Sequence, residues 1–312
     1  MKLPHVSVLM SSYNGEKYID EQIDSILCQK DVEVELMIRD DGSSDNTISI
    51  CQKYANRYSN IKFYKGKNIG VGKSFMELLM KSITSDYYSF ADQDDVWMDD
   101  KLKRAIEKIE AATKNEIKPT LYTSNQTLVD EKLIPYGMRF SGEPRHDLLQ
   151  EVSANKISGC TMVLNKKLRD ILIDSNYLPN DYFLNTRLHD TWIMLVANIM
   201  GSVIYDNESR LLYRQHDCNV VGAKEKNVMG KIKDKYVRLR SGKYKGNRSK
   251  LARYLRQKFE AHLTLQQKDE LQCIANCSNI QGLIDIMEKR DVRRVLKEND
   301  ILLIIKCLLR WV

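Results

Sequence analysis

The chain of 312 residues contains no CxxC pair, no long apolar run and no low-complexity tract. Its seven cysteines are scattered and odd in number, which favours a reducing cytoplasm with most thiols packed in the interior. No run of about 18 apolar residues exists for a spanning helix, and residues 1–25 lack the basic start and apolar stretch of a signal peptide. With 43% hydrophobic and 29% charged residues, the composition predicts a cytoplasmic globular protein with one large domain and an appendage.

The formal net charge of +7 is unevenly distributed along the chain. From Lys224 onward 22 Lys and Arg stand against 10 Asp and Glu, whereas residues 1–223 carry 27 against 32. We therefore expect two domains, 1–223 and a basic region 224–312. Such a charge block suits an acidic partner surface, either nucleic acid or anionic lipid. A nucleic-acid-binding protein is the less favoured alternative, because no recognisable binding motif accompanies the charge and the first two-thirds of the chain is acidic.

Strand and helix patterns alternate through the first half of the chain. Strands are predicted at 6–12, 32–40, 61–66 and 87–92, and helices at 16–29, 45–58, 72–84 and 99–113. This order predicts an α/β, Rossmann-like fold with a mostly parallel central sheet and helices on both faces. Ligands of such sheets bind beyond the carboxyl ends of the strands, and all four strands run into polar clusters.

The second half is less regular. We expect a strand and hairpin over 120–135, a polar loop region over 136–156, a strand over 156–165, a helix over 188–200, and a strand with a polar turn over 209–222. From about residue 226 the pattern is helical almost to the end, so that the fold should carry an α-helical C-terminal extension.

The stretch GKNIGVGKS, residues 66–74, looks like a phosphate-binding loop but fails on spacing. A Walker loop needs Gly, four residues, Gly, Lys and Ser or Thr, and counting back from Gly72 the first glycine would fall on Lys67. What remains is a Gly-rich turn with a lysine, Lys73, at a helix N-terminus, which suits an anionic ligand.

The stretch DQDD, residues 92–95, gathers three carboxylates at the end of a predicted strand. Carboxylates so close repel one another unless a cation neutralises them, and oxygen ligands of this kind suit Mg²⁺ or Mn²⁺ bound together with substrate phosphates. A solvated loop that caps a helix is the commoner role of acidic clusters. The apolar strand that leads to this cluster favours the metal site.

Four motifs in this order and spacing resemble a family 2 glycosyltransferase of the GT-A fold: VSVLMSSYNGEKYIDEQIDSILCQ, IRDDGSSDNT, KNIGVGKSF and SFADQDDVWMDDKL. The resemblance is strong over about residues 5–110, weaker to about 222 and absent from the tail. DQDDVW, LHDTW and RQHDCNVVG resemble bacterial rhamnosyltransferase-like enzymes that build surface polysaccharides such as capsules. This resemblance implies an inverting glycosyltransferase with a dTDP-rhamnose donor, or alternatively a UDP-hexose donor.

The resemblance also implies where the nucleotide-sugar lies. Ser11, Tyr13 and Asp41 would hold the nucleotide, since a carboxylate accepts from a pyrimidine imide N–H and a tyrosine stacks on a base. A core position for Tyr13 is the alternative. Asn68, Gly70 and Lys73 would form one wall of the pocket, although a lysine that only faces solvent is also compatible with the sequence.

Asp92, Gln93 and Asp94 match the DXD signature of the family, whose carboxylates hold the Mn²⁺ or Mg²⁺ that bridges the two donor phosphates. Asp92 and Gln93 would also contact the donor. His216 corresponds to a C-terminal histidine that completes metal binding in many such enzymes; an ordinary surface histidine is the alternative.

Asp190 matches the catalytic carboxylate of the family and would act as general base on an acceptor hydroxyl. A helix cap at Thr191 is the alternative or additional role. This chain has His189 where the family more often has an acidic residue. Gly159, His189 and Trp97 are expected on the acceptor side, and Gly159 could equally serve only a turn.

The basic tail is expected either to lie on the inner face of an anionic membrane, where a lipid-linked glycan acceptor would be met, or to pack on a partner or on the catalytic domain. The terminal stretch ILLIIKCLLRWV is too short to span a bilayer but could lie in its interface. The resemblance leaves a homo-oligomer open.

Overall fold

The computed structural model describes residues 2–216, 246–277 and 280–296. Its chain divides into two compact units, one of residues 1–144 with 157–223 and one of residues 145–156 with 224–312. The sequence did not indicate that 145–156 groups with the C-terminal residues.

The first unit is built on a seven-stranded sheet with the order β10-β6-β9-β4-β1-β2-β3. Its strands are β1 (His5–Ser12), β2 (Glu33–Asp40), β3 (Ile61–Lys65), β4 (Tyr87–Ala91), β6 (Thr120–Ser124), β9 (Val163–Asn165) and β10 (Ser202–Asp206). All neighbouring pairs are parallel except those that involve β9, which lies antiparallel between β4 and β6. The predicted mostly parallel α/β sheet is confirmed.

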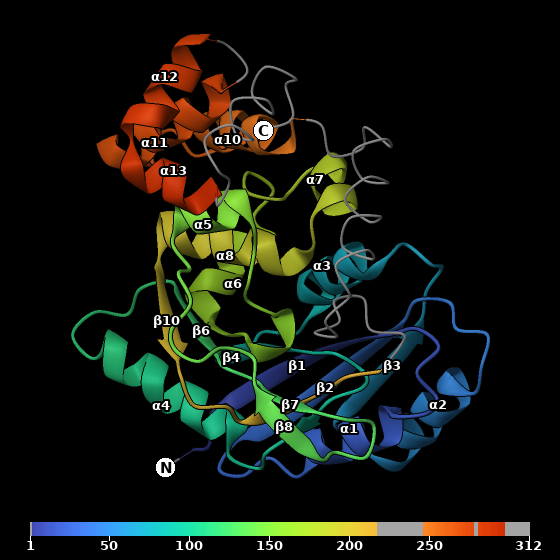
Figure 1. Ribbon diagram of the computed structural model, residues 1–312. Coiled ribbons are helices and arrows are strands. Elements are labelled where there is room, and N and C mark those ends of the chain that lie inside the picture. The colour runs from blue at the N-terminus through green and yellow to red at the C-terminus, as the bar shows by residue number, and fades with distance from the viewer. Residues whose placement is uncertain (1, 217–245, 278–279, 297–312) are drawn as a thin grey trace. The chain divides into compact units, whose positions relative to one another are not determined.

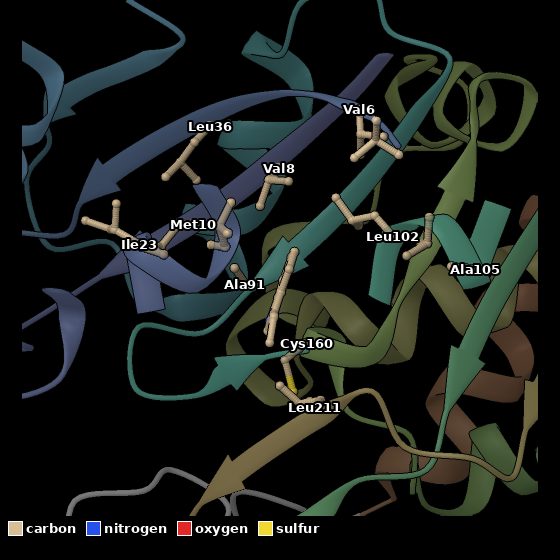
Figure 2. Packing of buried hydrophobic residues seen from close by; sticks show 14 of the residues in the cluster. Val6, Val8, Met10, Ile23, Leu36, Ala91, Leu102, Ala105, Cys160 and Leu211 are labelled. Carbon is tan, nitrogen blue, oxygen red and sulfur yellow. The ribbon is translucent and has the colours of Figure 1, made fainter. Parts of the chain in front are cut away.

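Helices cover both faces of this sheet (Figure 1). One set consists of α1 (Ile19–Leu27), α2 (Thr47–Arg57) and α4 (Lys101–Thr113), and the other of α3 (Val71–Lys81), α6 (Lys166–Ile173) and α8 (His189–Met200). Val6, Val8 and Met10 alternate along β1 and pack with Ile23 and Leu102 of the first set (Figure 2). The alternate positions of β1 point to the opposite face, on which Ser11 contacts Ser74 of α3.

A smaller sheet with the order β5-β11-β7-β8 supports the acidic DQDD segment. Its strands are β5 (Val96–Trp97), β7 (Thr127–Val129), β8 (Pro135–Met138) and β11 (Leu211–Arg214). β5 follows the acidic residues directly and pairs antiparallel with β11. His216 lies two residues after the end of β11. Two segments that are more than a hundred residues apart in sequence are thereby joined.

The prediction of a polar loop over 136–156 was wrong. This range contains the end of β8 and a helix, α5 (Leu148–Ser153), whose six residues are all buried. The Asp147 side chain caps this helix by accepting from the Gln150 N–H. The sequence pattern predicts neither α6, nor the short helix α7 (Asp181–Thr186), nor β10.

The second unit is helical. In addition to α5 it contains α10 (Asn247–Lys258), α11 (Leu265–Asn276), α12 (Ile280–Glu288) and α13 (Arg290–Leu296). Thr264 and Gln267 form a capping box at the start of α11, and Leu255, Phe259 and Ile274 are buried. The predicted helical extension is present, but the basic stretch 226–245 and the terminal stretch 301–312 lie outside the described residues. Among the helices of the described ranges, none is both long enough and apolar enough to cross a bilayer.

Candidate active site

The candidate site lies where β1, β2 and β4 end. Ser12 is in register with Asp40, and Met10 with Ala91, so that the residues that follow these strands emerge at one edge of the sheet. Tyr13, Asp41 and Asp92 therefore meet there, as the polar strand ends predicted.

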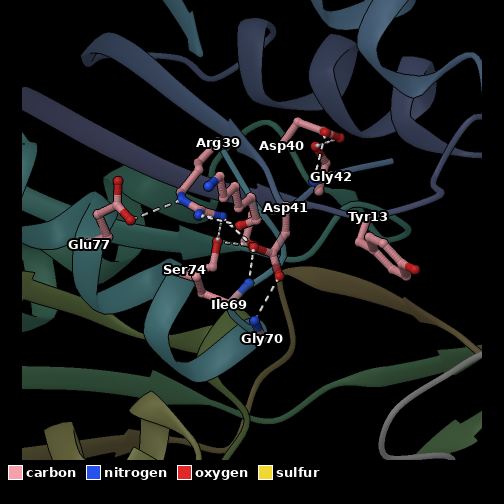
Figure 3. Close-up of polar contacts among 12 residues, drawn as sticks. Tyr13, Arg39, Asp40, Asp41, Gly42, Ile69, Gly70, Ser74 and Glu77 are labelled. Carbon is pink, nitrogen blue, oxygen red and sulfur yellow. Dashed lines mark hydrogen bonds and ion pairs between the residues drawn. The ribbon is translucent and has the colours of Figure 1, made fainter. Parts of the chain in front are cut away.

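Hydrogen-bond donors of Arg39, Ile69 and Gly70 surround the Asp41 carboxylate and form the Asp41 cradle (Figure 3). Its Oδ1 accepts from Arg39 Nη1 at 2.6 Å and from the Ile69 N–H at 2.9 Å, and its Oδ2 accepts from the Gly70 N–H at 2.9 Å. The preceding Asp40 has a different role, since it accepts from the N–H groups of Gly42 and Ser43 and so closes the turn after β2. Of the two adjacent acids, Asp41 is the one that faces the Gly-rich turn.

The Gly-rich turn leads into α3 at this cradle. Gly70 precedes the helix with φ 84° and ψ 150°, a conformation that only glycine adopts readily. Asn68 is exposed, and its backbone N–H lies close to Gly42. Lys73, in the first turn of α3, forms an ion pair of 2.8 Å with Asp181 of α7, so it does not merely face solvent.

Tyr13 is held through its backbone while its ring stays accessible. The Gln93 side chain accepts from the Tyr13 N–H at 2.8 Å and donates to the Tyr13 carbonyl at 3.0 Å. The Tyr13 side chain is not a core aromatic, since the residue is 49% exposed. Gln93 thus fixes the position of a ring that is free to stack on a base.

The acidic segment after β4 is crowded. Ligand atoms of Asp92, Asp95 and Cys160 lie within 4.8 Å of one another. Burial and then the charge of Asp94 raise the pKa of Asp92 to about 7, and burial raises the pKa of Asp95 well above its usual value. Oδ2 of Asp95 is buried and has no hydrogen-bond partner among the described residues.

Asp94 and His216 are brought together from opposite ends of the unit. Oδ2 of Asp94 lies 2.8 Å from Nε2 of His216, so that His216 is not an isolated surface residue. Arg214, which is buried, stabilises the arrangement, because its Nε donates to the Asp94 carbonyl at 2.9 Å and its N–H to Asp95 at 3.2 Å.

These groups fit a divalent cation. The carboxyl groups are too close to ionise together without a counter-charge, and the unpartnered oxygen of Asp95 is the donor type that Mg²⁺ and Mn²⁺ prefer. The thiol of Cys160 does not fit a hard cation, since burial raises its pKa well above the usual value and keeps it protonated. The ligand set of Asp92, Asp94 and His216 stays a prediction, with Asp95 as a neighbour.

Asp190 lies in the first turn of α8. Its Oδ1 accepts from the Thr191 N–H at 2.6 Å, but the helix begins at His189, so that Asp190 is not its N-cap. The charge of Asp190 contributes to raising the pKa of Asp92, which places this carboxylate close to the acidic segment. The Cβ atom of Asp190 lies 3.6 Å from the position that a Cβ on Gly159 would take.

His189 and Gly159 lie in direct contact. A Cβ on Gly159 would come within 2.6 Å of Nε2 of His189, so the glycine is needed for more than a turn. The His189 ring is 4% exposed and stacks on Phe75 with centroids 4.1 Å apart. Neither of its ring nitrogens has a hydrogen-bond partner among the described residues, and burial lowers its pKa to about 3.

Residues 7–172 match the family described as Glycosyl transferase family 2. The chain belongs to this family. It is 33% identical over 250 residues to a dTDP-rhamnosyl transferase, RfbG of Shigella flexneri, a match that covers 74% of this chain and 78% of that protein.

Solved structures confirm the fold of this glycosyl transferase. TarS of S. aureus, residues 1–349, superposes with a TM-score of 0.53 at 19% identity, over 87% of this chain and 70% of that one. The same protein in complex with UDP-GlcNAc gives a TM-score of 0.52 at 18% identity, over 93% and 83% of the two chains. The predicted GT-A type of α/β fold is thereby confirmed.

The placement of Trp97 on the acceptor side of this glycosyl transferase needs correction. Trp97 is 4% exposed and belongs to the core, where its backbone N–H donates to Ser25 Oγ of α1 at 3.1 Å. The ammonium of Lys101 lies 3.6 Å above its indole ring. Burial therefore removes this ring from any sugar.

Four residues that shape the site of the enzyme carried no predicted role: Arg39, Lys101, Cys160 and Arg214. The signal that could have identified two of them is a basic residue inside an otherwise apolar strand. Arg39 lies in β2 and Arg214 ends β11, and a cation at such a place requires buried partners.

Proposed function

We propose that this chain is an inverting, metal-dependent glycosyltransferase that moves a sugar from a nucleotide donor to an acceptor hydroxyl. The first candidate donor is dTDP-rhamnose, and the first candidate acceptor is a growing, lipid-linked glycan of a bacterial surface polysaccharide. One observation carries the proposal: the Asp41 cradle, the acidic segment Asp92–Asp95 and the carboxylate of Asp190 meet at one edge of the sheet.

Asp190 is the proposed general base. An ionised carboxylate beside the acidic segment can take the proton from an acceptor hydroxyl as its oxygen attacks the anomeric carbon. The bond to the leaving diphosphate breaks on the opposite side of that carbon, and the configuration inverts. The Thr191 N–H at the positive end of α8 stabilises the ionised form of Asp190.

The donor would be held by residues of the chain on two sides. Tyr13 offers an exposed ring for the base, and Asp41 offers an acceptor. Asp92, Asp94 and His216 would hold Mn²⁺ or Mg²⁺, which neutralises the charge on the departing diphosphate as a Lewis acid. The contact between Asp94 and His216 and the crowding around Asp92 support this ligand set.

Similarity to the dTDP-rhamnosyl transferase of Shigella flexneri favours a rhamnose donor. A UDP-hexose donor is the second candidate, since a solved structure with the same fold is in complex with UDP-GlcNAc. A thermal-shift screen of nucleotide sugars with Mn²⁺ or Mg²⁺ separates the two. Stabilisation by dTDP-rhamnose alone supports the first donor, and stabilisation by UDP-hexoses alone supports the second.

Two substitutions test the roles within this mechanism. Asp190→Asn keeps the shape of the side chain but cannot accept the proton, so donor binding should persist while transfer falls by about 10²-fold or more. Asp94→Ala should instead abolish metal-dependent donor binding. Transfer at the wild-type rate by Asp190→Asn would refute the base assignment, and stabilisation by none of the nucleotide sugars would refute the proposed function.

A further inference from the structure

Arg39 is a buried cation at the centre of the cradle around Asp41. Its residue is 2% exposed, and its guanidinium makes four hydrogen bonds. Nη1 donates to Asp41 Oδ1 at 2.6 Å and to Ser74 Oγ at 3.2 Å, Nη2 donates to the Lys67 carbonyl at 2.9 Å, and Nε donates to Glu77 Oε2 at 3.3 Å. One side chain thereby joins β2, the Gly-rich turn and α3 (Figure 3).

The backbone is shaped to admit this guanidinium. A Cβ atom on Gly66 would lie 2.6 Å from Cζ of Arg39, so any other residue there would displace it. Ser74 in turn contacts Ser11 at the end of β1, with 2.6 Å between the hydroxyl oxygens. Arg39 is therefore connected directly to the Gly-rich turn and to α3, and through Ser74 to the end of β1.

The hydrogen bonds that Asp41 already makes determine how many more it can accept from a ligand. A carboxylate offers about two acceptor positions on each oxygen. Oδ1 is filled by Arg39 and Ile69, whereas Oδ2 has a single donor within the described part of the chain, the Gly70 N–H. One acceptor position on Oδ2 is left for a ligand, and the guanidinium of Arg39, 2.6 Å from Oδ1, supplies the counter-charge that suits a carboxylate acting as acceptor.

An acceptor-only group distinguishes between pyrimidines. Uracil and thymine carry an N–H at N3, which can donate to Oδ2, whereas N3 of cytosine is an acceptor that would face the carboxylate without a proton between them. A site built to bind an N–H rejects an analogue that lacks it, because the buried polar group stays unpaired.

Resting on the proposed function, we propose that Arg39 is a positioning residue that fixes Asp41 as an acceptor and so makes the donor pocket select uracil and thymine nucleotides over cytosine nucleotides. A lysine cannot replace it fully, since an ammonium is a point charge and lacks the planar fork that reaches Asp41, Lys67 and Glu77 together.

The test measures dissociation constants of UDP, dTDP and CDP in the presence of Mn²⁺ by calorimetry, for the full chain and its variants. Wild type should bind UDP and dTDP at least about tenfold tighter than CDP. In Arg39→Met the affinities for UDP and dTDP should fall about tenfold or more while that for CDP changes little, so that the preference disappears. Arg39→Lys should retain part of the preference.

Arg169→Met provides the matched control. Arg169 in α6 is also a buried arginine, and its Nη2 donates to the Ser82 carbonyl at 2.8 Å. Within the described part of the chain none of its hydrogen bonds reaches Asp41 or the partners of Asp41, and it serves packing. This variant should lose stability and keep the preference for UDP and dTDP. If Arg39→Met does not fold, Arg39→Lys and Ser74→Ala, which removes one of the Nη1 acceptors, carry the test.

The outcomes distinguish an error in the role of Arg39 from an error in the proposed function. A wild type that binds none of the three nucleotides refutes the proposed function. A wild type that binds CDP as tightly as UDP, or folded Arg39 variants with an unchanged preference, overturns the role of Arg39 and leaves the proposed function standing.

Discussion

The imidazole of His189 is packed against Phe75 and Phe90, and burial lowers its pKa from 6.5 to about 3. The unfolded chain therefore binds a proton between these values that the folded chain does not. The stability that neutral His189 provides is complete above about pH 6.5 and is lost as the pH falls toward 3. By pH 5 the loss amounts to roughly 2 kcal/mol at 1.36 kcal/mol per pKa unit.

His189→Phe should flatten this dependence, because phenylalanine keeps an aromatic ring against Phe75 and cannot take up a proton. Urea unfolding at pH 7 and pH 5 measures the pH dependence. Between these pH values the free energy of unfolding of the wild type should fall by about 2 kcal/mol more than that of the variant. His262→Gln, at an exposed position, should behave like wild type. Equal losses in wild type and His189→Phe would contradict the account.

Gly159 is required by the same ring. Alanine there would bring its Cβ within 2.6 Å of His189 Nε2, and relief would have to come from a ring that is packed on two phenylalanines. We expect Gly159→Ala to cost about 1–3 kcal/mol and to lower transfer, because the displaced segment adjoins Asp190. Gly137→Ala, whose Cβ would meet nothing within 4 Å, should be neutral in melting temperature and activity. Similar melting temperatures for the two variants would disprove the clash.

At single positions, the sequence predicts which residues lie near the end of a strand but not which of them are exposed. Tyr13 and Trp97 are both aromatic residues beside motifs, yet one is exposed and the other lies in the core, since β5 pairs with β11 from the far end of the unit. That long-range pairing leaves no local pattern. Arg39 was missed for a related reason: its partners Lys67 and Glu77 are distant in sequence.

Among the elements, α5 gives the clearest prediction. Its residues Leu148, Leu149 and Val152 are buried, the Ser153 Oγ donates to the Val295 carbonyl at 3.0 Å, and the Ser153 carbonyl accepts from Arg248 at 3.2 Å. α5 therefore belongs with α10 and α13, although it lies in the sequence between strands of the first unit. A chain ended at residue 223 would leave these apolar side chains without cover.

We expect such a shortened chain to aggregate, and the same chain to become monodisperse when Leu148, Leu149 and Val152 are all replaced by serine. Size-exclusion chromatography of the two shortened chains measures the difference. Serine at these positions in the full-length chain should be destabilising instead, by about 2 kcal/mol or more for each leucine. A monodisperse shortened chain with unchanged α5 would show that the second unit does not cover this helix.

Element by element, periodicity was informative where elements are long and amphipathic. The predicted helices 45–58, 72–84 and 188–200 correspond to α2, α3 and α8 within a few residues at each end. α5 and α7 have six residues each, less than two turns, which is too short for a helical period to emerge from polar surroundings. The order of strands β10-β6-β9-β4 depends on tertiary pairing and could not be read from the sequence.

At the scale of the whole molecule, the sequence directly shows an uneven distribution of charge between the first two-thirds of the chain and its C-terminal third. Residues 224–312 carry 22 Lys and Arg against 10 Asp and Glu, while the unit with the candidate site is acidic overall. The proposed lipid-linked acceptor would bring the enzyme to a membrane, and anionic headgroups attract basic segments by about 1 kcal/mol for each Lys or Arg near the surface. We therefore expect the basic region to hold the protein on the inner face of an anionic membrane.

Liposome flotation tests this expectation with a variant in which five basic residues are changed to Glu: Lys231, Lys233, Lys235, Arg238 and Arg240. Wild type should float with vesicles rich in anionic lipid, less so with neutral vesicles, and less as salt screens the attraction. The matched control changes five exposed lysines of the acidic unit to Glu: Lys2, Lys53, Lys62, Lys65 and Lys108. Both variants have the same net charge, so flotation that is lost only in the first locates the attraction in the basic region. Equal flotation of wild type and the first variant would contradict membrane attachment by charge and leave packing on a partner or on the catalytic domain as the role of this region.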